Sequence, residues 1–367
     1  MPFFGYADAM AKKFADTYWN WEPDILGEGF TRRALMMRDG FSAMLVRYQP
    51  KRSFREQLQA PLRSVSLLYV HGWSDYFFQR ELAQVLAAAG VNFYALDLRH
   101  YGRNLPLDAA SGKGHATTPG FTTDLEDYSQ EFDAAISIIA RENRGTKLVL
   151  LGHSTGGLSA ALYAAANPGK VHALALNSPW LEFQASELGR TALTRLMQAG
   201  SLINPHFFLP TVDQGFYTRT VSSQFEGEWD YNLDWRPVNG FKLSTGFISA
   251  VFAAQAKVAK GLGLQIPVMV MLSAKDYLLP RWDDSASRSD VALNVQAVAQ
   301  RSLDLGDQLY LVRFKDALHD VFLSAPEVRS TAYWELASWL VSLANRGKDA
   351  KLAASIQGIM DAPAPGR

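Results

Sequence analysis

The sequence predicts an α/β fold with a mostly parallel central sheet, and three observations support this prediction. Short apolar runs alternate with longer helical patterns, as in chains whose parallel strands are covered by helices. The 367 residues are enough for one large domain with an insertion. Apolar residues make up 48% of the chain and charged residues 20%, which is ordinary for a globular protein.

Six apolar runs are expected to form the parallel strands, and five longer stretches the helices that flank them. The expected strands are Val65–Val70, Phe93–Leu96, Leu148–Leu151, Ala173–Leu176, Val268–Leu272 and Leu309–Phe314. The expected helices lie near residues 79–90, 122–143, 156–167, 291–304 and 326–345. Residues Ala34 to Tyr48 are expected to supply an antiparallel pair at the edge of the sheet.

An insertion interrupts the alternation after the strand that ends near Leu176. About ninety residues separate it from Val268, far more than a βαβ crossover needs. Residues 180–252 hold thirteen Phe, Tyr and Trp, which we expect to build a cap that partly lines an apolar site. The predicted domains are a core of residues 1–179 and 253–345, a cap of residues 180–252 and a tail of residues 346–367.

Charge and cysteine content exclude several classes of function. Lys plus Arg and Asp plus Glu both total 36, so no overall field favours nucleic acid or an anionic membrane. The chain has no cysteine, which excludes disulfides, thiolate metal sites and a cysteine nucleophile. No signal-peptide pattern and no run of 18 apolar residues is present, so we expect a soluble cytoplasmic protein without membrane insertion. The sequence does not indicate an oligomeric state.

The segment around Ser154 is the most informative in the chain. An apolar strand runs directly into Gly152-His153-Ser154-Thr155-Gly156, and a helix of small residues follows. A nucleophilic serine needs such a sharp turn to project its hydroxyl above the sheet, and the glycines remove side chains that would collide there. The strand, turn and helix together predict that Ser154 is a nucleophile.

A second turn is expected to complete an oxyanion hole. The strand Val65–Val70 ends in His71-Gly72-Trp73, where folds of this type place a backbone donor. We therefore predict that the backbone N–H groups of Trp73 and Thr155 bind the oxyanion. His71 is expected to hold the loop by hydrogen bonding, because a base would follow the serine in the chain.

The catalytic base is predicted to be His319. The order serine, acid, histidine requires a histidine after a late strand, and His319 follows Leu309–Phe314. Two residues compete for the acid. Asp276 lies a few residues after the strand Val268–Leu272, 43 residues before His319. Asp290 lies 29 residues before His319, close to the about 25–30 residues that a helix, a strand and their loops use.

These motifs resemble the lysophospholipase and monoacylglycerol-lipase-like branch of the α/β hydrolases, which is grouped with the serine aminopeptidases. The resemblance rests on three segments around His71, Ser154 and His319, and the turn Leu96–Arg103 is similar to the family's Asp-x-Arg-x-x-Gly turn. It covers roughly residues 60–180 and 265–345. It implies the α/β-hydrolase fold, and it favours Asp290 over Asp276 as the acid because the family often has serine at the earlier position.

The expected activity is hydrolysis of a small carboxylic ester with an apolar acyl chain, without a metal or an organic cofactor. An aminopeptidase or amidase of the same fold is the nearest alternative, and acyl transfer to an alcohol is a second. An aminopeptidase would bind the substrate ammonium through acidic side chains, for which the cap offers Glu182, Glu187, Glu226 and Glu228. A binding protein that retains the fold without chemistry is the alternative from another class.

Overall fold

The computed structural model describes residues 20–111, 113–183, 201, 204–209 and 215–345. The expected tail, Glu187 and the rest of residues 184–200 of the expected cap lie outside this part of the chain. A nine-stranded sheet forms the centre, in the order β1-β2-β3-β5-β4-β6-β7-β8-β9. Its strands are β1 Glu22–Pro23, β2 Phe30–Met36, β3 Ser42–Tyr48, β4 Val65–Val70, β5 Asn92–Asp97, β6 Lys147–His153, β7 Ala173–Asn177, β8 Val268–Ser273 and β9 Leu309–Phe314.

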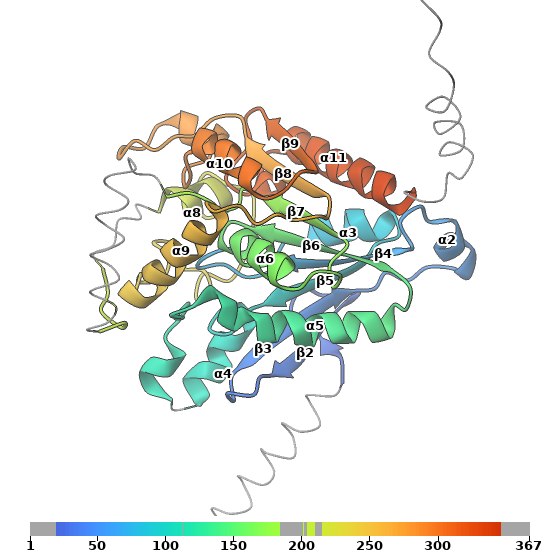
Figure 1. Cartoon of the computed structure of the whole chain (residues 1–367), viewed down its shortest axis with the longest axis horizontal. Helices are drawn as coiled ribbons and strands as arrows, with labels where there is room; N and C mark the ends of the chain where they lie inside the picture. The colour runs from blue at the N-terminus through green and yellow to red at the C-terminus, as the bar shows by residue number, and fades with distance from the viewer. Residues whose placement is uncertain (1–19, 112, 184–200, 202–203, 210–214, 346–367) are drawn as a thin grey trace, which may run out of the picture.

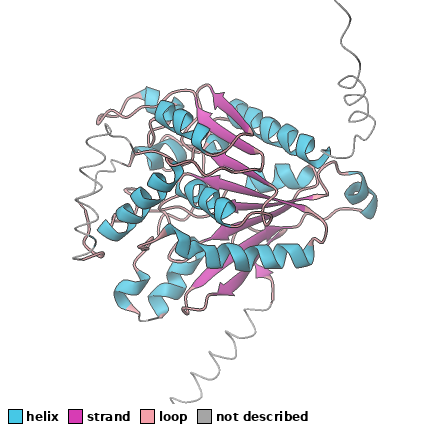
Figure 2. Ribbon diagram, in the orientation of Figure 1, coloured by secondary structure: helices cyan, strands magenta, loops and turns pink. Residues whose placement is uncertain are grey.

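The six strands β4 to β9 are parallel to one another, and β1, β2 and β3 form an antiparallel edge. β3 pairs antiparallel with both β2 and β5, whereas β4 pairs parallel with β5 and β6. Because parallel strands end at the same edge, the loops after β4, β6, β7, β8 and β9 gather there. The predicted mostly parallel sheet with an antiparallel edge pair is confirmed (Figure 2).

Helices cover both faces of the sheet (Figure 1). One face carries α5 Ser129–Glu142, α6 Thr155–Ala166, α9 Thr245–Val258 and α10 Val295–Arg301. The other carries α3 Arg80–Ala88 and α11 Pro326–Asn345. The short helices α2 Phe54–Gln59, α4 Leu105–Ala110 and α8 Phe216–Val221 lie in connecting segments.

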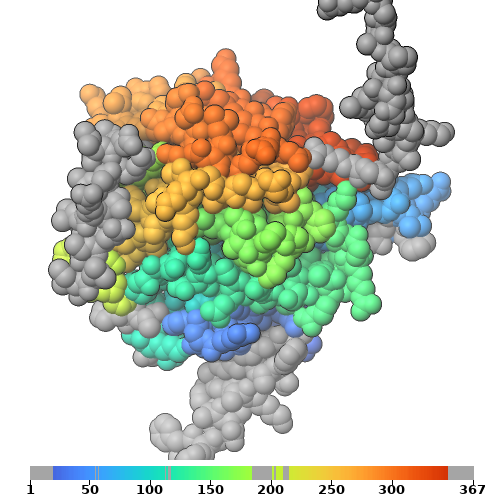
Figure 3. Space-filling model, in the orientation of Figure 1, coloured from blue at the N-terminus to red at the C-terminus, as the bar shows by residue number. Residues whose placement is uncertain are grey.

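Two apolar clusters fill the spaces between the sheet and these helices. In β4, Leu68 and Val70 join the cluster under α5 and α6, and Leu67 and Tyr69 join the cluster under α3 and α11. This alternation follows from the two-residue period of a strand, and it explains why buried parallel strands read as continuous apolar runs. In the space-filling view, α5, α6, α9 and α10 lie side by side on the face that is turned to the viewer (Figure 3).

Two expected helices begin later than predicted. The helix expected from residue 122 begins as α5 at Ser129, after a 3₁₀ turn at Leu125–Tyr128. The helix expected from residue 291 begins as α10 at Val295, because the Asn294 side chain accepts the Ala297 N–H at 2.8 Å. The pattern of apolar residues therefore extends beyond the helix itself.

The described part of the insertion packs against the core through its aromatic residues. The members in contact with the two apolar clusters are Trp180, Phe183, Tyr217, Trp229, Tyr231, Trp235, Phe241, Phe247 and Phe252. Helix α9 continues to Val258, so the expected boundary at residue 252 falls inside a helix. Most of the aromatic residues of the insertion therefore pack against the core. Among the described helices, none has the length and hydropathy to span a membrane.

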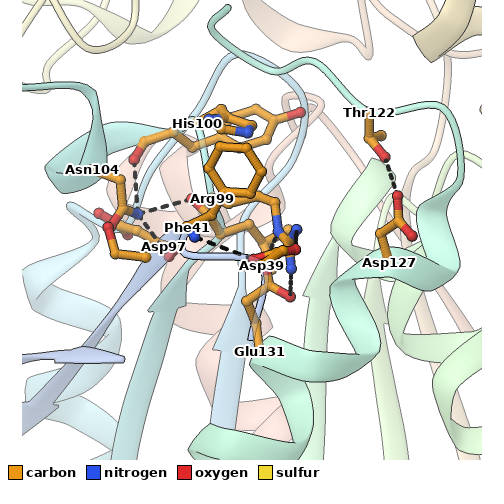
Figure 4. Close-up of polar contacts among 12 residues, drawn as sticks. Asp39, Phe41, Asp97, Arg99, His100, Asn104, Thr122, Asp127 and Glu131 are labelled. Atoms are coloured by element: carbon orange, nitrogen blue, oxygen red, sulfur yellow. Dashed lines mark hydrogen bonds and ion pairs between the residues drawn. The ribbon is translucent and has the colours of Figure 1, made fainter. Parts of the chain in front are cut away.

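The turn after β5 is held by a polar network that Figure 4 shows in close-up. Arg99 donates to Glu131 on α5 and to Asp39 in the β2–β3 loop, both at 2.5 Å. The Asn104 side chain donates to the backbone carbonyls of Asp97, Leu98 and Tyr101. These bonds fix a turn that would otherwise carry buried, unsatisfied carbonyl groups. The Asp-x-Arg-x-x-Gly motif therefore has a structural role here.

Candidate active site

Ser154 lies at the sharp turn between β6 and α6. Its backbone has φ of 51° and ψ of −117°, a conformation that a non-glycine residue rarely adopts. Three features hold the turn: the Ser154 N–H donates to Asn177 O at 3.0 Å, and its carbonyl accepts from Gly157 N at 3.0 Å and from Trp180 N at 3.0 Å. Such strain, maintained by surrounding hydrogen bonds, is typical of a catalytic nucleophile at a strand-to-helix turn.

The glycines around Ser154 are required by close backbone approach. A Cβ on Gly152 would lie 2.5 Å from the Gly157 Cα atom, and a Cβ on Gly156 would lie 2.2 Å from the His71 carbonyl oxygen. A Cβ on Gly72 would lie 2.9 Å from the Ser154 Cβ atom. The loop after β4 is therefore in contact with the serine turn, and larger residues would push the two apart.

His319 forms a buried hydrogen-bonded pair with Asp290. Its Nδ1 atom lies 2.8 Å from Asp290 Oδ2, and the side chains are 3% and 0% exposed. The other carboxylate oxygen, Oδ1, accepts the Ala292 and Leu293 N–H groups at 2.8 Å each. Asp290 is thus fixed on one side by the backbone and orients the imidazole on the other.

Asp276 lies beside Asp290 but does not contact His319. The segment from residue 277 to 289 loops out and returns, so that the two aspartates form a parallel bridge at the end of β8. Tyr277 N donates to Asp290 O at 2.7 Å, and Asp276 Oδ2 accepts the Val295 N–H at 3.0 Å. Both aspartates therefore lie where the acid is expected. Asp290 contacts the histidine, whereas Asp276 accepts a backbone N–H group at the start of α10.

The two predicted backbone donors belong to different segments, Trp73 to the loop after β4 and Thr155 to the start of α6. Thr155 is the first residue of α6, where a helix leaves its N–H groups without intrahelical acceptors. Within the described part of the chain, neither the Thr155 nor the Trp73 N–H donates to a protein acceptor. Both donors thus remain available to an oxyanion beside Ser154.

His71 fixes this loop and is held in one neutral form. Its Nε2 accepts the Leu98 N–H at 3.1 Å, so Nδ1 carries the proton and donates to Gly72 O at 2.8 Å. Burial lowers the pKa of His71 below its ordinary value. With both nitrogens engaged, His71 holds the loop, as predicted, and cannot serve as a base in this arrangement.

Asn177, at the end of β7, ties the serine turn to the histidine loop. Its carbonyl accepts Ser154 N–H, and its side chain donates to Asp320 Oδ1 at 2.6 Å and accepts the Val321 N–H at 3.1 Å. Gln79 donates to the second Asp320 oxygen at 3.0 Å. This network was not predicted from the sequence. Two signals for it are present there, the polar residue that ends the buried strand Ala173–Asn177 and the acid next to His319.

The insertion also contributes Tyr217 on α8, which covers the histidines. Its hydroxyl lies 3.1 Å from His153 Nε2, and its ring packs edge-on to His319 with centroids 5.1 Å apart. The His153 Nδ1 atom lies 3.1 Å from Asn177 O, and burial lowers the pKa of this imidazole. His153 is therefore a neutral neighbour of His319, with ring centroids 4.8 Å apart.

The two buried histidines predict a pH dependence of stability. Because burial lowers the pKa of His71 and His153, below about pH 6.5 the unfolded chain binds protons that the folded chain does not. The contribution of these two neutral imidazoles to the free energy of unfolding is therefore complete above that pH and is lost as the pH falls.

Urea unfolding at pH 8 and pH 5.5 should show a lower free energy of unfolding at pH 5.5. The His71→Gln and His153→Gln variants should each show a smaller difference, and an undiminished difference in both would contradict this origin.

The fold and this site together define the class of protein. A strained serine after a parallel strand, a late histidine paired with an aspartate, and two free backbone donors form the arrangement of an α/β hydrolase that uses a serine. In the described part of the chain, no group of three or more His, Asp and Glu side chains is arranged to hold a metal ion.

The comparison with known families agrees with this class. Residues 63–296, more than half of the chain, match the family described as serine aminopeptidase, S33. The protein therefore belongs to this family of α/β hydrolases and is a serine hydrolase of the lipase and esterase type.

Individual relatives show the same likeness. The chain is 26% identical over 278 residues to a monoacylglycerol lipase of Mycolicibacterium smegmatis, covering 75% of this chain and 88% of the relative. A monoglyceride lipase from Saccharomyces cerevisiae, solved with a substrate analogue, superposes with a TM-score of 0.62 at 16% identity, covering 88% and 99% of the two chains. The monoacylglycerol lipase of Paleococcus ferrophilus has a TM-score of 0.55 at 21% identity, covering 76% and 94%.

Proposed function

We propose that this protein hydrolyses carboxylic esters through an acyl-enzyme on Ser154, with His319 as the base and Asp290 as its partner. The observation that carries the proposal is the buried 2.8 Å contact between His319 Nδ1 and Asp290 Oδ2, on a loop that Asn177 ties to the serine turn. The aspartate orients the ring so that Nε2 is left for the serine proton.

The reaction proceeds in two acyl transfers. As the Ser154 oxygen attacks the ester carbonyl, its proton passes to His319 Nε2, and the carbonyl oxygen becomes an oxyanion held by the N–H groups of Trp73 and Thr155. Collapse breaks the ester C–O bond, and His319 returns the proton to the leaving alcohol. Water then attacks the acyl-enzyme with the same proton transfers and releases the carboxylic acid. The amino end of α6 also favours the negative charge.

The proposed substrate is an ester with an apolar acyl chain and a small alcohol. The relatives named as monoacylglycerol lipases support this substrate class. Apolar groups beside the proposed oxyanion donor support it as well, because the Trp73 ring packs against Phe247 and Phe241 with centroids 3.7 and 5.9 Å apart. The buried rings of Phe247 and Phe241 make the surroundings of the donor apolar, which favours a hydrocarbon chain over a charged peptide terminus.

Ion pairs of the insertion argue against an aminopeptidase. Of the four glutamates considered for binding an ammonium group, three are paired with arginines. Glu182 accepts from Arg301 at 2.6 Å, Glu228 from Arg329 at 2.8 Å, and Glu226 pairs with Arg219. A carboxylate already paired with a guanidinium has less charge to offer a substrate ammonium. The fourth, Glu187, lies outside the described residues.

A comparison of substrates tests the proposal. We expect the protein to hydrolyse p-nitrophenyl acyl esters, to prefer chains longer than acetyl, and to leave amino-acid p-nitroanilides almost unchanged. A fluorophosphonate probe should label the protein at Ser154, as located by mass spectrometry. Faster turnover of p-nitroanilides than of esters would favour the aminopeptidase, and absence of labelling would indicate a binding protein. Added glycerol should leave fatty acid as the main product, whereas a new acylglycerol would indicate acyl transfer.

A further inference from the structure

A buried ion pair joins the insertion to the loop that carries the oxyanion donor. Arg236 Nε, in the segment between α8 and α9, lies 3.1 Å from Asp75 Oδ1, and the two side chains are 3% and 1% exposed. Burial raises the pKa of the Asp75 carboxyl, and the Arg236 guanidinium opposes this rise. A buried ion pair is costly to desolvate and adds little to stability compared with apolar residues. Its position therefore points to another role.

The residues just before Asp75 are held by the same part of the insertion. The ring of Trp73 packs against Phe247 on α9, and the Ser74 hydroxyl accepts the Phe241 N–H at 3.0 Å. Ser74 has φ of 49°, a strained conformation that these contacts must maintain. Three consecutive residues of the loop are thus held by residues 236–247, and the first of them supplies the proposed oxyanion N–H.

Arg236 also contacts two tyrosines of the insertion. Its guanidinium lies over the Tyr217 ring at 4.5 Å and donates to the Tyr231 hydroxyl at 2.5 Å. Tyr217 in turn contacts His153 and packs edge-on to His319. Arg236 therefore links the loop after β4 with the side chain that covers the proposed base.

We propose that Asp75 and Arg236 are positioning residues, whose ion pair aligns the Trp73 N–H and the Tyr217 ring with the reacting groups. This inference rests on the proposed function, because the alignment matters only if Trp73 N–H binds an oxyanion. The pair touches neither Ser154 nor the substrate carbonyl, and it acts through the two elements that it joins. Its loss should lower kcat and leave KM almost unchanged, since ground-state binding of the acyl chain does not need the pair.

The test compares Arg236→Met, Asp75→Leu and the double variant on a p-nitrophenyl acyl ester. Each single variant leaves one buried group without its partner and should be less stable, whereas the double variant replaces both by apolar groups and should recover stability. We expect kcat of the double variant to stay about 10- to 100-fold below wild type, because a displaced oxyanion donor costs this much or more. KM should stay within about threefold of wild type if ground-state binding is unaffected.

Glu126→Gln is the matched control. It removes the ion pair between Glu126 and Lys257 at 2.6 Å, which also joins α9 to the core but does not contact the loop after β4. Its kcat should equal that of wild type. If the double variant recovers kcat together with its stability, or if its loss is confined to KM, the positioning role is overturned.

Amide hydrogen exchange of residues 72–78 separates failure of this inference from failure of the proposed function. The double variant should exchange faster than wild type in this segment, and Glu126→Gln should not. Unchanged exchange in the double variant overturns the inference whatever the activity. If Ser154→Ala hydrolysed esters as wild type does, the proposed function would fail, and faster exchange would still support the ion pair as the element that holds the loop.

Discussion

Replacing Ser154 by alanine should abolish ester hydrolysis, lowering kcat by a factor of about 10⁶, the loss found when a serine nucleophile is removed from a triad. The alanine keeps the Cβ atom and the backbone bonds of the turn, so the fold should not change. The measurement is steady-state turnover of a p-nitrophenyl acyl ester, with circular dichroism and thermal unfolding to confirm the fold. The fluorophosphonate label should disappear as well.

Ser159→Ala is the control for this substitution. Ser159 lies five residues further on in α6, is buried, and its hydroxyl has no hydrogen-bond partner within the described structure. This variant should retain wild-type kcat and labelling. If Ser154→Ala retained activity above a few per cent, the nucleophile would have to be another residue and the proposed mechanism would be wrong.

The second large effect is expected at Asp290. An asparagine there cannot stabilise the imidazolium, and its amide can donate to His319 Nδ1 and so favour the wrong tautomer. We expect Asp290→Asn to lower kcat by about 10⁴, as such a change does in other triads. Because the Ala292 and Leu293 N–H groups can still find an oxygen acceptor, the loop should keep its conformation. Turnover of the same ester, measured from pH 6 to 9, reports the loss.

Asp276→Asn is the comparison that resolves the two candidates. Its side-chain oxygen can still accept the Val295 N–H, so both stability and kcat should stay close to wild type. A larger loss of kcat in Asp276→Asn than in Asp290→Asn would assign the acid to Asp276. Small losses in both would show that the proposed triad lacks its third member.

Local sequence was sufficient for the parts of the site that depend on consecutive residues. An apolar run, Gly152-His153-Ser154-Thr155-Gly156 and a small-residue helix describe the strand, turn and helix of the serine in one segment. The geometry of that turn requires glycines because of backbone approach, and the requirement is visible in the sequence. The same reasoning places His71 and His319 after strands, at the end of the sheet where the loops gather.

The choice of acid depended on how a loop returns in space. Asp276 and Asp290 are both placed at the end of β8, because the intervening residues loop out and the two aspartates pair. Spacing along the chain favoured Asp290 only through average element lengths. The contact of His319 Nδ1 with Asp290, and of Asp276 with Val295, appears only when β8, α10 and the loop after β9 are packed together.

The sequence by itself therefore determined the fold class and indicated the serine turn, because the period of apolar residues and the glycine spacing are properties of a continuous segment. The tertiary structure decided which aspartate meets the histidine. It also revealed that Asn177 ties two loops and that Arg236 reaches Asp75 across 161 positions of the chain. These contacts join residues that share no local pattern. The sheet brings their loops together at one edge. Because burial there removes water, a charged or polar group must form its hydrogen bonds or ion pairs with another segment of the chain.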